Sequence, residues 1–461
     1  MQNNHIGEQF NSVKLTLNFF GGTMSTKDKQ TSRKITLQTF PILLIFAMIL
    51  AACGSPATPA PTQPPATQPP ATQPPATEVP TATEPPVELP DTIKVGAVIP
   101  ITGRYAAGGA QVKNGYELAV EDINNAGGVD VGGTKIPLEL VELDDESDPT
   151  KTVQNLETLF SSDNVVAYLG GFGSDLHAAA AGIAEKNKVP YIGVAFALYK
   201  PHQQGFKYLF SPFPKSPALA TATFDMLDSL SPKPTKIAIF AEKTDWGAEL
   251  GGLWTDEANK RGYTITTYEY APGTTDFSDI ILPAKDSGAE VVLALPNPPD
   301  GLALTKQIKE LDFNANAYVF IRAADPPSWG ENLGIDGNGF MLMPGWNRGV
   351  KFAGAADMAT RYQAKFNAPA AATTGPAYAA VQILADAITR AGSLDRDAIR
   401  DAIAATDMDT IVGHVTFNAD GTGNVVTIIN QWQDGKQALV WPPDQALAQI
   451  QYPAIPWKDR K

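Results

Sequence analysis

The sequence predicts an α/β fold with two lobes, each a mostly parallel sheet flanked by helices, and three observations support this prediction. Short apolar runs rich in branched residues alternate with longer stretches of helical periodicity. The alternation starts at Thr92 and begins again after Phe206. A glycine-rich turn joins a strand to a helix in VVAYLGGFGSDLHAAAA, which begins at Val165. Strands that alternate with helices form parallel sheets covered on both faces.

The first set of elements begins with a strand in TIKVGAVIP, and a helix with apolar residues at helical spacing follows it until Gly127 and Gly128. A second helix is expected from Pro149. Asp144 and Asp145 follow a strand and are expected to bond neighbouring loops. The strands of this set are predicted at residues 92–100, 136–143, 165–169 and 189–194.

The second set follows a bend-rich crossing segment at residues 206–214 and a helix at 217–230. Its strands are expected at 236–241, 265–270, 291–295 and 318–321, with helices from Asp276 and Asp300. Helices at 355–366 and 376–391 come next, and a closing β-meander is predicted from 414–417 and 425–432. Two open α/β sheets of this kind place a ligand cleft between the carboxyl ends of their strands.

The turn after Leu169 contains a candidate anion site. Ser174 is predicted to cap the following helix, whose first turn presents unpaired N–H groups and the positive end of a dipole. Two other interpretations remain open. The turn could begin a dinucleotide fingerprint, but Leu176 stands where the third glycine belongs. The glycines could also serve only to make a tight turn.

The N-terminal segment reads as a signal for secretion. Basic residues precede the apolar run PILLIFAMILAA, which is too short to span a bilayer and leads into Cys53, the only cysteine of the chain. This resembles a bacterial lipobox, so residues 1–52 are predicted to be a lipoprotein signal peptide and Cys53 the lipidated residue. The alternative is an ordinary signal peptide. Residues 53–90 are predicted to be a Pro/Thr-rich linker with polyproline II character.

Composition argues against several functions. A net charge of −14 is unsuited to nucleic acid, since phosphate contacts require clustered Lys and Arg. The chain has no GxSxG or HExxH motif, and its four histidines are scattered. A single cysteine permits no internal disulfide or cysteine metal cluster. We therefore expect a protein that is no enzyme and carries no cofactor or metal.

Several collinear motifs together resemble the leucine-isoleucine-valine-binding proteins of ABC importers, which are type I periplasmic binding proteins. They lie between Thr92 and Trp432 and comprise Gly115–Asn124, Gly127–Val129, Asp144–Asp145, Gly170–Ser174 and Asp276–Ser278. The resemblance implies three hinge crossovers and closure of the lobes around a ligand. It implies that residues 91–213 and 344–424 form lobe 1, and that 214–343 and 425–461 form lobe 2.

The resemblance also implies roles for particular residues. Ser174, with Gly173 and Phe172, matches the turn that holds the carboxylate of an amino acid ligand. Ala195, Phe196 and Ala197 match the loop that usually binds the ammonium, although Ala197 replaces a threonine. Further positions are expected to face the ligand, with Asp325 as the one available acidic partner for an ammonium: Tyr105, Trp246, Asn297 and Asp325.

These departures leave the ligand open between an amino acid and a small carboxylate or amide that lacks an ammonium. Arg322, if it faces the cleft, would favour a second anionic group. The expected protein is a monomeric, lipid-anchored, extracytoplasmic binding protein that delivers its solute to an ABC permease. The alternative is a ligand-sensing lipoprotein that signals through a partner.

Overall fold

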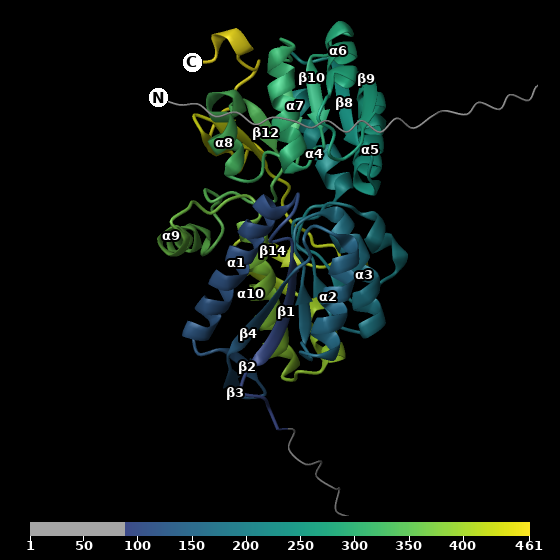
Figure 1. Ribbon diagram of the computed structural model, residues 1–461. Coiled ribbons are helices and arrows are strands. Elements are labelled where there is room, and N and C mark those ends of the chain that lie inside the picture. The colour runs from purple at the N-terminus through teal and green to yellow at the C-terminus, as the bar shows by residue number, and fades with distance from the viewer. Residues whose placement is uncertain (1–87) are drawn as a thin grey trace, which may run out of the picture. The chain divides into compact units, whose positions relative to one another are not determined.

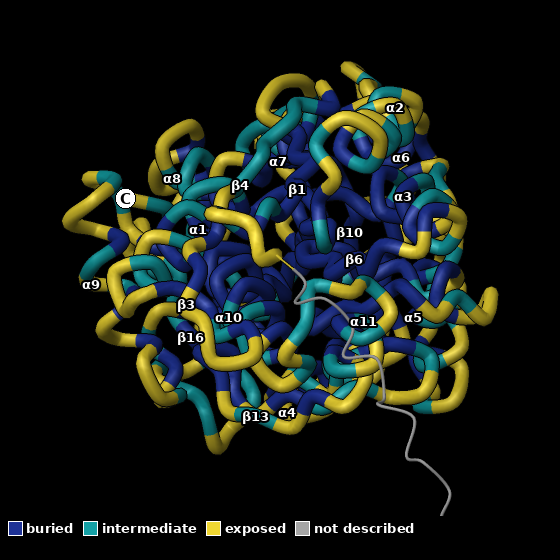
Figure 2. The backbone as a smooth tube through the Cα atoms, turned by 90° about the horizontal axis from the view of Figure 1, so that it is seen from below, coloured by how far each residue is buried: buried dark blue, intermediate teal, exposed yellow. Residues whose placement is uncertain are grey.

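The computed structural model describes residues 88–461, and the predicted signal peptide, Cys53 and most of the linker lie outside this range. Two parallel or mostly parallel sheets organise the chain (Figure 1). We call the five-stranded sheet with its helices lobe 1, and the seven-stranded sheet with its helices lobe 2. The backbone near β1, β6 and β10 is buried, whereas the peripheral loops are exposed (Figure 2).

The sheet of lobe 1 is parallel throughout, with strand order β4-β1-β5-β6-β7. Its strands are β1 (Ile93–Ile99), β4 (Leu138–Asp144), β5 (Ala167–Leu169), β6 (Tyr191–Ile192) and β7 (Leu209–Phe210). The alternate side chains of these strands pack against different helices, as a two-residue period requires.

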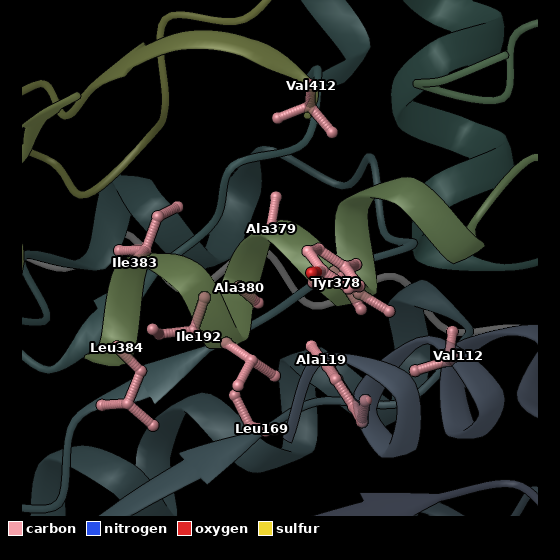
Figure 3. Packing of buried hydrophobic residues seen from close by; sticks show 14 of the residues in the cluster. Val112, Ala119, Leu169, Ile192, Tyr378, Ala379, Ala380, Ile383, Leu384 and Val412 are labelled. Atoms are coloured by element: carbon pink, nitrogen blue, oxygen red, sulfur yellow. The ribbon is translucent and has the colours of Figure 1, made fainter. Parts of the chain in front are cut away.

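One face of this sheet is covered by α1 (Ala106–Asn125) and α10 (Thr374–Ala391). The other face is covered by α2 (Pro149–Ser161) and α3 (Ser174–Asn187). Figure 3 shows apolar side chains of α10, among them Ala380 and Ile383, beside Leu169 and Ile192 of the sheet. The remaining elements of lobe 1 are β2 (Val129–Val131), β3 (Thr134–Ile136), η1 (Lys200–Gln204), α9 (Ala355–Phe366), α11 (Arg396–Ala404), β13 (Asp407–Thr410) and β14 (Gly413–Thr416).

The sheet of lobe 2 has the strand order β16-β15-β12-β11-β10-β8-β9, in which β15 and β16 are antiparallel additions. Its strands are β8 (Lys236–Glu242), β9 (Thr264–Tyr270), β10 (Val291–Ala294), β11 (Ala317–Phe320), β12 (Phe340–Leu342), β15 (Ile429–Gln433) and β16 (Lys436–Trp441). Its helices are α4 (Ser216–Ser229), α5 (Asp245–Arg261), α6 (Ser278–Asp286), α7 (Pro298–Glu310) and α8 (Ser328–Leu333), with short turns η2 (Gly334–Gly337) and η3 (Trp457–Asp459). The first two helices cover one face and the next three the other.

Two sequence predictions are wrong here. The bend-rich segment at 206–214 contains β7, which at two residues is too short to show an alternating pattern. The predicted β-meander does not exist, because β14 pairs with β13 in lobe 1 whereas β15 pairs with β12 and β16 in lobe 2. Periodicity identifies strands but not their partners, and here the chain changes lobes between the two runs.

The chain passes between the sheets at three places, residues 211–215, 343–354 and 417–428. Apolar packing is continuous across the first of them, from Tyr168 and Phe196 in lobe 1 through Phe213 to Phe224 in lobe 2. Relative movement of the lobes therefore bends short connecting segments that border a shared core.

Candidate functional site

A small cavity of 20 Å³ lies where the carboxyl ends of both sheets meet, and we call it the interlobe cavity. A volume of this size holds about one water molecule. Its walls bring together these predicted site residues: Phe172, Gly173, Ser174, Ala195, Phe196, Ala197, Trp246 and Asp325. Arg322 also lines it. An amino acid therefore requires these side chains to move apart before it can enter.

The lobe 1 wall begins at the N-terminus of α3. Gly173, with φ 115°, occupies the cap position, so the prediction that Ser174 caps the helix is wrong. A Cβ at residue 173 would lie 2.7 Å from the ring of Tyr105, which leaves no space for a side chain there. Ser174 is instead the first helical residue, and its Oγ accepts a hydrogen bond from the Leu198 amide at 3.4 Å. Its hydroxyl and the first-turn amides of α3 lie at the positive end of the helix dipole.

The second part of this wall is the loop at residues 195–197, whose carbonyl groups are already engaged. Ala195 O accepts from Gly173 N at 3.3 Å, and Ala197 O accepts from Ser216 N at 2.8 Å. Phe196 O accepts from Lys215 Nζ at 2.9 Å. These bonds fix the loop to both lobes.

Three basic side chains surround the ring of Phe196. His177 stacks on it at 4.4 Å between centroids, and Lys215 Nζ lies 3.3 Å from the ring centroid. His202 is also parallel to the ring, at 5.7 Å. Burial lowers the pKa of both histidines to about 3 and places the pKa of Lys215 well below its usual value. Two neutral histidines therefore pack against Phe196 in the lobe 1 wall.

The lobe 2 wall is built on a buried ion pair between Arg322 and Glu242, with a separation of 2.7 Å. Arg322 Nη2 also donates to Leu295 O at 2.9 Å, and Nη1 donates to the hydroxyl of Tyr105 at 3.2 Å. Its cation is therefore neutralised within the protein and offers little to a second ligand anion. Sequence reasoning missed Glu242, although an acidic residue that ends the apolar run KIAIFA is an available signal.

Asp325 provides the remaining charge of this wall. Its side chain is buried, and Oδ1 has no hydrogen-bond partner among residues 88–461. Burial raises the pKa of Asp325 to about 7, against the opposing effect of the positive charge on Arg322. A buried polar atom without a partner is unusual in a folded protein.

Two predicted site residues lie behind the cavity wall. Tyr105 packs on Phe172, and its hydroxyl donates to Asp175 at 3.1 Å while it accepts from Arg322. Asn297 caps α7 and donates to Glu242 at 3.0 Å. Asn297 thus orients the partner of Arg322, and Tyr105 bonds to both lobes.

A further contact between the lobes involves Glu249 on α5. Its two carboxylate oxygens accept hydrogen bonds from the amides of Tyr199 and Lys200 at 2.7 and 2.9 Å. Lys200 Nζ also pairs with Asp245 at 3.0 Å. These contacts and the Arg322–Tyr105 bond must break if the lobes separate.

Residues 88–461 contain neither a candidate membrane span nor a candidate metal site. None of the helices in this range combines the length and apolar character needed to cross a membrane. No three His, Cys, Asp or Glu side chains in it are grouped so that they could bind a metal ion.

Comparison with known proteins identifies the family. Residues 92–437 match the family model described as Periplasmic binding protein. The chain belongs to this family. Among its relatives is the Leu/Ile/Val-binding protein homolog 8 of Brucella abortus, 26% identical over 381 residues that cover 78% of this chain and 93% of the relative. Homolog 7 from the same organism is 24% identical over 385 residues, with 78% and 94% covered.

Solved structures of other binding proteins have the same fold. The leucine-binding protein LivK of Thermotoga maritima matches with a TM-score of 0.70 at 23% identity, covering 76% of this chain and 99% of that one. A solute-binding protein of R. palustris in complex with benzoate matches with a TM-score of 0.69 at 18% identity, covering 79% and 99%. LivJ of Streptococcus pneumoniae in complex with isoleucine gives 0.67 at 21%, covering 76% and 100%.

These findings confirm the resemblance inferred from the sequence and the two-lobed α/β fold of this type I periplasmic binding protein. The family consists of solute-binding proteins rather than enzymes. The predicted bounds of the lobes and the ligand-binding roles of individual residues stay predictions.

Proposed function

We propose that the protein is a lipid-anchored, extracytoplasmic solute-binding component of an ABC importer. It captures a branched-chain amino acid or a related small carboxylate or amide between its lobes and delivers it to the permease. The Cys53 lipobox and the Pro/Thr-rich linker support anchoring at the outer face of the membrane, and we expect a monomer.

The main support for this proposal is the carboxylate oxygen Oδ1 of Asp325, which has no hydrogen-bond partner among residues 88–461. An amino acid needs donors for its carboxylate and an acceptor for its ammonium. Ser174 and the first-turn amides of α3 supply donors from lobe 1, and Asp325 supplies an acceptor from lobe 2. Because a buried ammonium needs a negative partner and Asp325 is the acidic residue among those that line the cavity, recognition of an ammonium depends on Asp325. A ligand held from both lobes favours their closure.

The pKa of Asp325 allows the ligand class to be read from the pH dependence of affinity. An ammonium binds the ionised carboxylate, so amino acid affinity should fall about tenfold per pH unit below 7. A carboxylate without an ammonium instead needs Asp325 protonated as a donor, so its affinity should fall as the pH rises above 7. An uncharged amide can donate to the ionised carboxylate or accept from the protonated acid, so its affinity should depend little on pH.

The test is calorimetric titration of the purified protein with leucine, isovalerate and isovaleramide at pH 6 and pH 8. Leucine binding that tightens about tenfold from pH 6 to pH 8 supports an amino acid carrier. Ser174→Ala should lower the affinity for each of these ligands. Ser162→Ala, at an exposed position, is the matched control and should leave the affinity unchanged. Failure of every amino acid, carboxylate and amide to bind would overturn the proposal.

A further inference from the structure

A second, larger cavity of 320 Å³ lies beside the interlobe cavity and shares no lining residue with it. We call it the side cavity. Lobe 2 supplies Pro327 and Trp432, lobe 1 supplies Ala370 and Ala371, and the crossover after β12 supplies Arg348. Its volume is at the lower end of the range for sites that bind organic molecules. The interlobe cavity, at 20 Å³, has no such space.

The chemistry of the side cavity is that of an amphipathic site. Proline, alanine and tryptophan side chains form its apolar part. Arg348, Lys436 and Glu331 also line it, and all three are exposed. None of the three makes an ion pair within residues 88–461. Two unpaired cations against one acid leave the cavity with one net positive charge.

We propose that the side cavity is a second binding site, for a small monocarboxylate with an aromatic apolar body. The apolar body packs against Trp432 and Ala370, and the carboxylate faces Arg348 and Lys436 at the exposed side. One carboxylate balances the single net positive charge. This site is distinct from the solute site and extends the proposed function.

Hydrogen bonds connect the two cavities. Gln437, which lines the side cavity, donates through Nε2 to Asp325 O at 2.8 Å. Trp432 Nε1 donates to Ala324 O at 2.9 Å. The wall of the side cavity therefore holds the backbone of the residue whose carboxylate lines the interlobe cavity. Since the side cavity has walls from both lobes, its occupant should favour the closed arrangement and tighten solute binding.

Benzoate is a suitable probe, because it is a rigid aromatic monocarboxylate. Its affinity for the purified protein should fall about tenfold in Arg348→Gln/Lys436→Gln. It should not change in Lys351→Gln, which removes an exposed cation outside the cavity. Benzamide, with the same ring and no charge, should bind more weakly than benzoate. Ala371→Leu, which adds apolar volume inside the cavity, should also weaken benzoate.

Ser174→Ala separates this proposal from the proposed function. This substitution should weaken the affinity for leucine and leave the affinity for benzoate unchanged. The Arg348/Lys436 double variant should weaken the affinity for benzoate and leave the affinity for leucine unchanged. Benzoate binding that is lost in Ser174→Ala and kept in the double variant would place benzoate in the interlobe cavity and overturn the second site. Equal affinity for benzoate and benzamide, or no benzoate binding, would overturn it as well, whatever leucine does.

Discussion

Replacing Asp325 by asparagine should stabilise the ligand-free protein at neutral and alkaline pH while it weakens binding of an amino acid. The carboxylate is buried, and its Oδ1 has no partner among residues 88–461. The pKa of Asp325 is about 7 in the folded protein and about 3.9 in an unfolded chain. Between about pH 4 and pH 7, Asp325 therefore keeps its proton in the folded protein but loses it in the unfolded chain.

The magnitude follows from this difference. Asp325 destabilises the folded state progressively as the pH rises from about 4 to about 7, by about 4 kcal/mol in total, and the effect is constant above that. Asparagine has no such charge, but its amide is also buried, which costs about 1–3 kcal/mol. Because the cost of burying the amide applies at every pH, we expect Asp325→Asn to destabilise the protein by about 1–3 kcal/mol at pH 4 and to stabilise it by about 1–3 kcal/mol at pH 8.

Urea unfolding of both proteins without ligand, at several values between pH 4 and pH 8, measures this difference directly. Other titrating groups cancel in the comparison of variant with wild type, and Asp256→Asn on the exposed face of α5 is the matched control. A difference in unfolding free energy that does not change with pH would refute the reasoning, because it would mean that Asp325 is ionised normally. Stabilisation accompanied by unchanged leucine affinity would contradict the ammonium role.

Other substitutions test the contacts around the cavity. Tyr105→Phe removes the hydroxyl that accepts from Arg322 and should weaken ligand affinity about tenfold in calorimetry, and unchanged affinity would mean that this bond does not favour closure. Glu249→Gln loses the charged acceptor of two amides and should increase the radius of gyration of the ligand-bound protein in small-angle scattering. His177→Leu should reduce the loss of stability below pH 6.5 by about 1.4 kcal/mol per pH unit. The buried imidazole stays neutral down to a pKa of about 3, whereas a histidine in the unfolded chain takes up a proton below its usual pKa. An unchanged dependence of the unfolding free energy on pH would contradict the burial of His177 as a neutral group. Gly173→Ala should lower the unfolding free energy by at least about 2 kcal/mol because of its positive φ and its contact with the Tyr105 ring, and thermal unfolding would detect this.

Much of the fold could be predicted from periodicity, because both sheets are dominated by apolar strands that alternate with helices. The predicted helix at 355–366 coincides with α9. The strand predicted at 165–169 is shorter in the structure, Ala167–Leu169. The strand β7 was missed because it has only two residues, which are too few to show the alternating pattern of a strand. Strand partners across the lobes depend on distant segments, which no local window contains.

The site was predicted unevenly for a similar reason. The glycine turn before α3 is local, and its position at the cavity follows from the strand that precedes it. The pairing of Arg322 with Glu242 joins residues that are 80 apart in the chain, so neither residue type nor spacing revealed it. The unusual pKa of Asp325 is a consequence of burial, which residue identity alone does not specify.

The hydrogen bonds from Gln437 and Trp432 to the backbone of residues 324–325 suggest a route for engineering this protein as a biosensor. Substituting the residues that touch a solute changes recognition and signal together. The hairpin of β15 and β16 supports the same segment from outside the solute site. Residues on that hairpin could therefore adjust the response range, or carry a fluorescent reporter, while every group that touches the solute keeps its native chemistry.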